Sequence, residues 1–300
     1  MDIVTHAMAG AIIASPILPV APLTASCFIF GSVLPDTDAL SRLFGKVAFL
    51  RWHQTYTHSL PLIILATALL WPAARLLGCD ESWAPIALGA GMLLHAAMDA
   101  TNTYGVAILA PFSHRRYCTE WVFFIDGIVV AVSIGCLSAI LIQLHLGRTD
   151  YFAASAAYCC FLAGYWAVRA LLYRRAMSLT PPGTRSLVPS AMIPWRFFGY
   201  AVHDGVASLF DLSVISGIAK DQMTCQTYDS KAEHLLDGVV EYRLMRELSR
   251  GYCTVQVVSN GGKTEMVCRD LRIRNFGGHF GQLDLSFDED GKLKRKVFHV

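Results

Sequence analysis

The chain has 300 residues, of which 54% are hydrophobic and 16% are charged, whereas ordinary soluble domains are about 25% charged. A net charge of +2 without a dense basic run excludes the usual electrostatic surface of a nucleic-acid-binding protein, so no nucleic acid is expected as a partner. The nine cysteines contain no C-x-x-C pair, so neither a thiolate metal site nor a disulfide framework is expected.

Hydrophobic residues are unevenly distributed along the chain. Residues up to 172 form long runs with almost no charge, whereas the rest alternates charged and hydrophobic residues. This asymmetry predicts two domains. We place an α-helical, multi-spanning membrane domain at residues 1–178 and a small, mostly β soluble C-terminal domain of the α+β type at residues 190–300.

The first hydrophobic stretch, residues 7–34, contains Pro16, Pro19 and Pro22 in its middle. Proline removes a backbone donor and clashes with the preceding turn, so one straight helix is not expected. We predict two short helices around a proline-rich turn, each too short to cross a bilayer core of ~30 Å, which needs about 20 residues. Such a re-entrant hairpin returns Pro35 to the side on which His6 begins.

Four further hydrophobic stretches are candidates for membrane spans. Residues 60–77, 127–146 and 151–172 have the length and composition of spans. Residues 84–97 are fewer and would cross only with part of the following polar segment. The alternative is a set of buried helices in a large soluble protein.

Basic residues predict the orientation, because they favour the cytoplasmic side of membrane proteins. They lie in three regions, before residue 60, before residue 127 and after residue 172, and comprise Arg42, Lys46, Arg51, Arg115, Arg116, Arg174, Arg175 and Arg185. The intervening short loops hold only Arg75 and Arg148. We therefore expect the three basic regions and the C-terminal domain to be cytoplasmic.

The C-terminal part has the turn signals of a β domain. Strands are predicted at residues 195–203 and 208–216, around Asp204-Gly205. Asn260-Gly261 and Asp290-Gly291 are hairpin signals between further alternating runs. Residues 232–248 have helical spacing, so one helix is expected among the strands.

The hydrophobic half contains few ionisable side chains, and most fall on the predicted cytoplasmic side. Such groups near a membrane cost several kcal/mol, so they usually belong to a pathway, a pair or a ligand site. Imidazoles with carboxylates and without thiolates suit zinc, manganese or iron. The candidate metal ligands are His6, Asp36, Asp38, His53, His58, His95, Asp99 and Asp126.

His95 and Asp99 are four residues apart, which puts an imidazole and a carboxylate on one face of a helix. Alone, the pair also fits a buried histidine and an aspartate near a helix end. Likewise, Pro35-Asp36-Thr37-Asp38 fits a turn, and the pair His53 and His58 fits a loop. The convergence of all these motifs on one membrane face is what favours a metal site.

An ordered series of motifs resembles that of the bacterial YdjM-like, LexA-regulated, membrane-bound metal-dependent hydrolases. It comprises Asp2, Thr5-His6, Gly31-Ser32-Val33-Leu34-Pro35-Asp36-x-Asp38, His53-x-x-x-Thr57-His58-Ser59, His95-x-x-x-Asp99-x-x-Asn102, Pro111-Phe112-Ser113 and Ile125-Asp126. The resemblance covers residues 1–175 and implies a bacterial inner-membrane protein with a divalent metal, zinc above all. Gln54 departs from the family, which often has arginine there. A more distant similarity connects the family with zinc-dependent phospholipases C and single-strand nucleases.

The resemblance and the motifs together predict a hydrolase of phosphoester or ester bonds at the cytoplasmic membrane face. We expect Asp36 to take the proton of a metal-bound water, and Arg115 or Arg116 to hold an anionic substrate. The expected partners are the lipid bilayer and a lipidic or phosphorylated substrate. Two alternatives remain: the two arginines also fit a basic loop at a headgroup surface, and the whole chain also fits a non-catalytic metal transporter or metal-stabilised scaffold.

Overall fold

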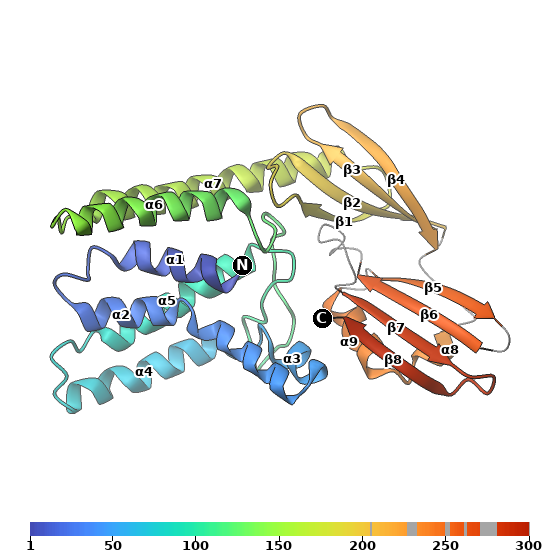
Figure 1. The fold of residues 1–300 in the computed structure, drawn as a ribbon, viewed down its shortest axis with the longest axis horizontal. Helices are drawn as coiled ribbons and strands as arrows, with labels where there is room; N and C mark the ends of the chain where they lie inside the picture. The colour runs from blue at the N-terminus through green and yellow to red at the C-terminus, as the bar shows by residue number, and fades with distance from the viewer. Residues whose placement is uncertain (205, 227–232, 250–252, 261–262, 271–280, 300) are drawn as a thin grey trace. The chain divides into compact units, whose positions relative to one another are not determined.

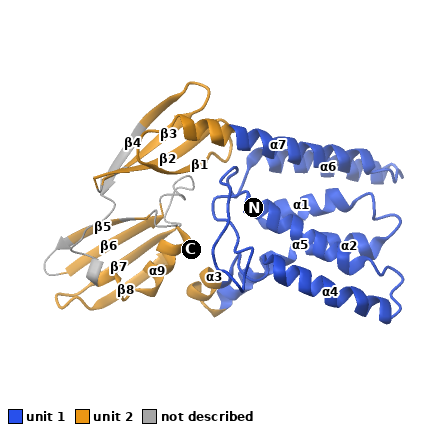
Figure 2. Cartoon of the chain, turned by 180° about the vertical axis from the view of Figure 1, so that it is seen from behind, with its two compact units in different colours: residues 1–43, 52–171 blue, residues 44–51, 172–300 orange. Residues whose placement is uncertain are grey.

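The computed structural model describes residues 1–204, 206–226, 233–249, 253–260, 263–270 and 281–299 (Figure 1). The chain divides into two compact units, which are residues 1–43 with 52–171, and residues 44–51 with 172–300 (Figure 2). The first unit is helical, and the second is built mainly from two antiparallel sheets. A helical N-terminal part and a β-rich C-terminal part are thus confirmed.

The first unit begins with the two short helices that the prolines predict, α1 (Ile3–Ala14) and α2 (Pro22–Gly31). Asp2 caps α1 by accepting a hydrogen bond of 3.0 Å from the backbone nitrogen of Thr5. Pro22 occupies the first turn of α2, where a missing N–H group costs nothing. The two helices pack against each other and place Asp2 and Ser32 at the same end of the unit.

A 3₁₀ helix, η1 (Leu34–Phe44), follows α2 and leads into α3 (Lys46–Trp52). Helix α4 (Leu60–Leu76) begins after Ser59, its N-cap residue, and α5 (Ala84–Ala100) returns along it. A loop of residues 101–126 then leads to α6 (Gly127–His145) and α7 (Phe152–Ser178). The loop is fastened by a pair of backbone hydrogen bonds between Val106 and Tyr117, 2.8 and 3.0 Å long.

Among the described residues, two helices are long and apolar enough to cross a membrane, α6 with 19 residues and α7 with 27. Helices α4 and α5 are apolar but have only 17 residues each. The structure therefore supports two candidate spans, fewer than the multi-spanning arrangement that the sequence predicts.

Glycines bring the backbones of α2 and α5 into contact. A methyl group built on Gly91 of α5 would overlap the carbonyl oxygen of Phe28, and one built on Gly31 of α2 would overlap that of Leu88. Only glycine fits such a close approach of two helices. The contact fixes the end of α2, and with it the start of η1, against the middle of α5.

The second unit contains two four-stranded meanders. The first consists of β1 (Thr184–Pro189), β2 (Arg196–His203), β3 (Val206–Ser213) and β4 (Ile218–Gln226). The second consists of β5 (Cys253–Asn260), β6 (Lys263–Asp270), β7 (Gln282–Phe287) and β8 (Leu293–His299). Strands β1 and β4 are absent from the strands that the sequence predicts. The turn at Asp290-Gly291 has the expected glycine in a left-handed conformation, whereas Gly205 and Gly261 lie outside the described residues.

The predicted single helix at residues 232–248 is divided in the structure. Residue 232 lies outside the described residues, α8 covers Glu233–Leu236, and α9 covers Val240–Leu248. The backbone nitrogen of Val239 donates to the carbonyl oxygen of Leu236, and this tight turn ends α8. Tyr242 and Met245 of α9 join the core of the second sheet.

Replacing Gly91 by alanine is expected to destabilise the helical unit by about 1–3 kcal/mol, because the added methyl group overlaps backbone atoms of α2 that cannot move aside. Gly135→Ala in α6 is the matched control, since nothing lies within 4 Å of its added methyl group. Thermal unfolding of the purified protein in detergent measures both variants. Equal unfolding temperatures for the two variants would contradict the proposed close packing.

Candidate metal centre

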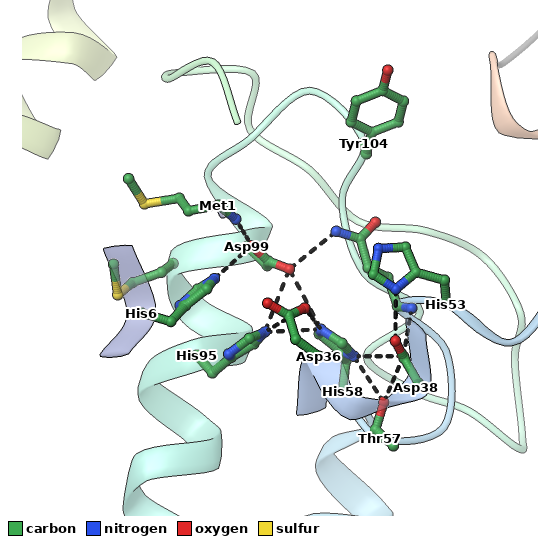
Figure 3. Close-up of polar contacts among 12 residues, drawn as sticks. Met1, His6, Asp36, Asp38, His53, Thr57, His58, His95, Asp99 and Tyr104 are labelled. Atoms are coloured by element: carbon green, nitrogen blue, oxygen red, sulfur yellow. Dashed lines mark hydrogen bonds and ion pairs between the residues drawn. The ribbon is translucent and has the colours of Figure 1, made fainter. Parts of the chain in front are cut away.

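Four side chains from distant parts of the first unit meet at one end of its helices: Asp36, His58, His95 and Asp99 (Figure 3). Their candidate ligand atoms all lie within 4.8 Å of one another. His58, His95 and Asp99 have no solvent exposure, and Asp36 retains 9%. Among the described residues, this group has the composition and the spacing to hold a metal ion.

The distances between the donor atoms suit a single small cation. The Nε2 atoms of His58 and His95 are 3.0 Å apart. Asp36 Oδ1 lies 3.4 Å from the Nε2 of His95 and 3.8 Å from that of His58, and Asp99 Oδ2 lies 3.7 and 3.4 Å from the same two atoms. Tetrahedral zinc with bonds of about 2.0–2.1 Å separates its ligand atoms by roughly 3.3–3.4 Å. The four groups therefore fit a tetrahedral ion with little movement.

Local structure explains how each ligand reaches the centre. His95 and Asp99 are one turn apart on α5, as the i,i+4 spacing predicts. His58 directly precedes Ser59, the residue that caps α4. Asp36 lies in the first turn of η1, where its backbone nitrogen donates to the carbonyl oxygen of Val33 at 3.1 Å.

Hydrogen bonds on the outer nitrogens set the tautomers of both imidazoles. His95 Nδ1 lies 2.8 Å from the carbonyl oxygen of Ser32, which can only accept, so this nitrogen carries the proton. His58 Nδ1 lies 3.4 Å from a carboxylate oxygen of Asp38. Each Nε2 thus keeps its lone pair for the centre, which is the arrangement that metal-binding histidines adopt.

Asp38 and His53 lie outside the group of four side chains and contact it through His58. The Asp38 carboxylate accepts hydrogen bonds from His53 Nδ1 at 2.6 Å, from Thr57 Oγ1 at 2.7 Å and from the backbone nitrogen of Gln54 at 2.9 Å. Burial alone would raise the pKa of Asp38, but the hydrogen bonds from His53 and His58 hold it well below its usual range. The ionised Asp38 therefore orients His58 instead of facing the central group.

Burial keeps the His58 imidazole neutral. It lowers the pKa of His58 to about 4, although the hydrogen bond to Asp38 acts in the opposite direction. A neutral imidazole is the form that binds a metal ion. The same side chain is thus held in the correct protonation state and the correct orientation.

His6 lies against the centre from α1. Its Nε2 is 3.2 Å from Asp99 Oδ1, and its ring stacks on that of His95 with centroids 3.6 Å apart. The backbone nitrogen of Met1 also contacts Asp99 Oδ1. His6 therefore contacts the carboxylate oxygen of Asp99 that the other two histidines leave available.

Asp126, Arg115 and Arg116 have other neighbours. Asp126 caps α6 by accepting from Ile128 and Val129, and it also accepts from the Tyr165 hydroxyl at 2.9 Å. Arg115 is exposed, with its guanidinium 5.5 Å from the ring centroid of Tyr117. Arg116 donates to the carbonyl oxygen of His53 at 2.8 Å and to Gln54 Oε1 at 3.2 Å.

The sequence did not predict which residues would pair in two contacts near the site. Gln54 Nε2 donates to Asp99 Oδ2 at 3.0 Å, although 45 residues separate the two. Tyr165 reaches Asp126 from the interior of an apolar helix. No rule of sequence spacing predicts such pairs. For Tyr165, the one indication in the sequence was a polar hydroxyl inside a hydrophobic run.

Asp38→Asn is expected to weaken zinc binding by about 10–100-fold while leaving the four central side chains in place, since it removes the charge that orients His58. Asp284→Asn is the matched control, because Asp284 pairs with His299 at 3.0 Å in the second unit. Titration of the metal-free protein with zinc against a chromophoric chelator gives both affinities. An Asp38→Asn affinity equal to that of the control would refute the orienting role.

The chain matches a known family and a curated relative. The model of the family described as YdjM inner membrane protein matches residues 1–175. An uncharacterised protein of Bacillus subtilis (strain 168), YfhP, is 26% identical over 191 residues, which cover 58% of this chain and 55% of YfhP. The chain thus spans about half the length of that relative. No solved structure matches.

Proposed function

Because this chain belongs to the YdjM inner membrane protein family, we propose that it is a membrane-bound, metal-dependent hydrolase of phosphoester or ester bonds. The buried group of Asp36, His58, His95 and Asp99 is the observation that carries the proposal. Two carboxylates removed from water are costly unless a cation compensates them, and these donors suit zinc, with manganese or iron as the other choices. When bound there, such a metal supplies a Lewis acid and a water whose pKa is lowered toward ~7.

Asp36 is the proton acceptor in this proposal, so His58, His95 and Asp99 would hold the metal and the fourth position would be left to water. It is the one member of the central group with solvent exposure, so water and substrate approach from its side. Burial raises the pKa of Asp36, but its contacts with the imidazoles of His95 and His58 outweigh that effect and lower it. Asp36 is therefore ionised at neutral pH and can accept the proton of the attacking water.

Arg115 is the residue that we assign to the anionic part of the substrate. Its guanidinium is exposed, whereas that of Arg116 donates to the carbonyl oxygens of His53 and Gly105 and is committed to the protein. A guanidinium binds phosphate or carboxylate oxygens well. A lipidic or phosphorylated substrate suits such a group beside a membrane.

The proposal includes a multi-pass topology, with domains at residues 1–178 and 190–300. Helix α4 exposes Ile64, Leu65 and Leu69 by 56%, 54% and 64%, a hydrophobic surface that lipid would cover. We therefore assign α4 and α5, as well as α6 and α7, to the membrane. Arg42 lies in η1, the element that carries Asp36, and Arg115 lies in the loop that follows Asp99 and α5. We therefore assign this end and the C-terminal domain to the cytoplasm, the side that basic residues favour.

A metal transporter is the alternative function, and the position of the central group disfavours it. His58 precedes α4, Asp36 follows α2, and His95 and Asp99 lie in the last two turns of α5. All four thus lie at helix ends. A transport pathway instead needs ionisable groups near the middle of the membrane.

Asp99→Asn is expected to lower hydrolysis by at least about 100-fold, because it removes a metal-binding charge from a site without solvent. The assay uses purified zinc- or manganese-loaded protein in mixed micelles, with phospholipids and soluble phosphoesters and esters as substrates. Asp284→Asn, in the second unit, should retain wild-type activity. Protein that contains metal but hydrolyses no member of the panel would refute catalysis, and zinc flux into liposomes that depends on His95 would establish the transporter instead.

The topology is tested with single cysteines in a cysteine-free chain. Asp80→Cys and Thr149→Cys lie in the turns α4–α5 and α6–α7, so a membrane-impermeant maleimide added to spheroplasts should label both. Ser113→Cys and Arg185→Cys should react only after the membrane is opened. Labelling of Thr149→Cys but not of Asp80→Cys in spheroplasts would show that α4 and α5 do not cross.

A further inference from the structure

We infer that Gln54 is a positioning residue of the metal centre, which holds the Asp99 carboxylate with its side chain and the Asp38 carboxylate with its backbone. The inference rests on the proposed metal site and goes beyond it, because it assigns a role to a residue that is neither a ligand nor a proton acceptor. Gln54 lies between the carboxylates of Asp38 and Asp99. It contacts both Asp38 and Asp99.

Each polar group of Gln54 has a partner. Its backbone nitrogen donates to Asp38 Oδ2 at 2.9 Å, and its carbonyl oxygen accepts from the backbone nitrogen of Ala107 at 3.0 Å. Its side-chain Nε2 donates to Asp99 Oδ2 at 3.0 Å, and its Oε1 accepts from Arg116 at 3.2 Å. The residue is 7% exposed, so these hydrogen bonds form largely out of water.

An amide matches these two neighbours as no charged side chain does. A carboxylate only accepts hydrogen bonds and a guanidinium only donates them, so a group between them needs a donor on one side and an acceptor on the other. A glutamate at position 54 would set two carboxylates against each other, and a lysine would set two cations against each other. The contacts also assign the amide, with its nitrogen toward Asp99 and its oxygen toward Arg116.

Arg116 is itself held in place. The same guanidinium donates to the carbonyl oxygens of His53 at 2.8 Å and Gly105 at 3.4 Å. It therefore acts on the centre through Gln54 and fixes the far end of the amide. Asp99, with one oxygen on Gln54 and the other on His6, cannot rotate away from the imidazoles of His58 and His95.

The backbone of Gln54 gives an independent argument. Its φ of 59° lies in the left-handed region, which side chains other than glycine disfavour. Strained residues of this kind cluster at functional sites. Glycine would adopt this conformation without steric cost, so the conformation alone does not account for a glutamine. The contacts that its side chain makes with Asp99 and Arg116 do.

Two substitutions separate positioning from folding. Gln54→Gly removes the strain and the side chain together, whereas Gln54→Met keeps the length of the side chain and removes both of its hydrogen bonds. We expect both variants of the full-length protein to bind zinc about 10–100-fold more weakly than wild type, with a shifted visible spectrum of the cobalt(II) form. Thermal unfolding of metal-free Gln54→Gly should occur at or above the wild-type temperature.

Asp204→Gly is the matched control. Asp204 is also left-handed, with a φ of 48°, but lies in the second unit. Relief of strain there should leave zinc affinity and the cobalt spectrum unchanged. Wild-type zinc affinity and an unshifted cobalt spectrum in both Gln54 variants would overturn the inference while leaving the proposed metal site intact. If the wild-type chain binds neither ion, the proposed site and the inference both fail.

Discussion

In the first unit two imidazole nitrogens lie 3.0 Å apart, with two carboxylates around them and almost no solvent, and the fold has to hold these groups together. Such a set of acceptors repels itself unless a cation lies among them, because burial removes the water that would otherwise screen the charges. The surrounding structure keeps these groups together. The carbonyl oxygen of Ser32, the carboxylate of Asp38 and the amide of Gln54 each orient one of them.

Most residues of this site could be identified from the sequence. The sequence did not show which of them face the centre and which orient their neighbours. The i,i+4 spacing of His95 and Asp99 predicted one face of a helix, and three prolines predicted two short helices in place of one. The motif at residues 35–38, in contrast, gives Asp36 and Asp38 equal standing. They separate because η1 is helical and not extended, so side chains two residues apart point in different directions. Asp36 therefore faces the Nε2 atoms, and Asp38 faces the Nδ1 of His58.

The membrane assignment from the sequence is likewise supported in part. The resemblance to the YdjM family is confirmed, and two helices have the length of spans. The more distant similarity to phospholipases C and nucleases finds no support among the matches.

In the second unit, strands β1 and β4 were not predicted from the sequence. Neither Thr184–Pro189 nor Ile218–Gln226 has the clear alternation of hydrophobic and polar residues that marks a half-buried strand.

The contact of Gly91 with the end of α2 limits how the centre can open. Because their backbone atoms are in contact, α2 and α5 cannot slide past each other. They form one rigid side of the centre, and α5 contributes His95 and Asp99 to it. The opposite side of the centre consists of η1 and the turn before α4, two short segments that are joined to each other by side-chain hydrogen bonds. If the site holds an ion, its exchange would proceed by displacement of Asp36 and His58, and its rate would depend on the residues that restrain η1 and the turn before α4.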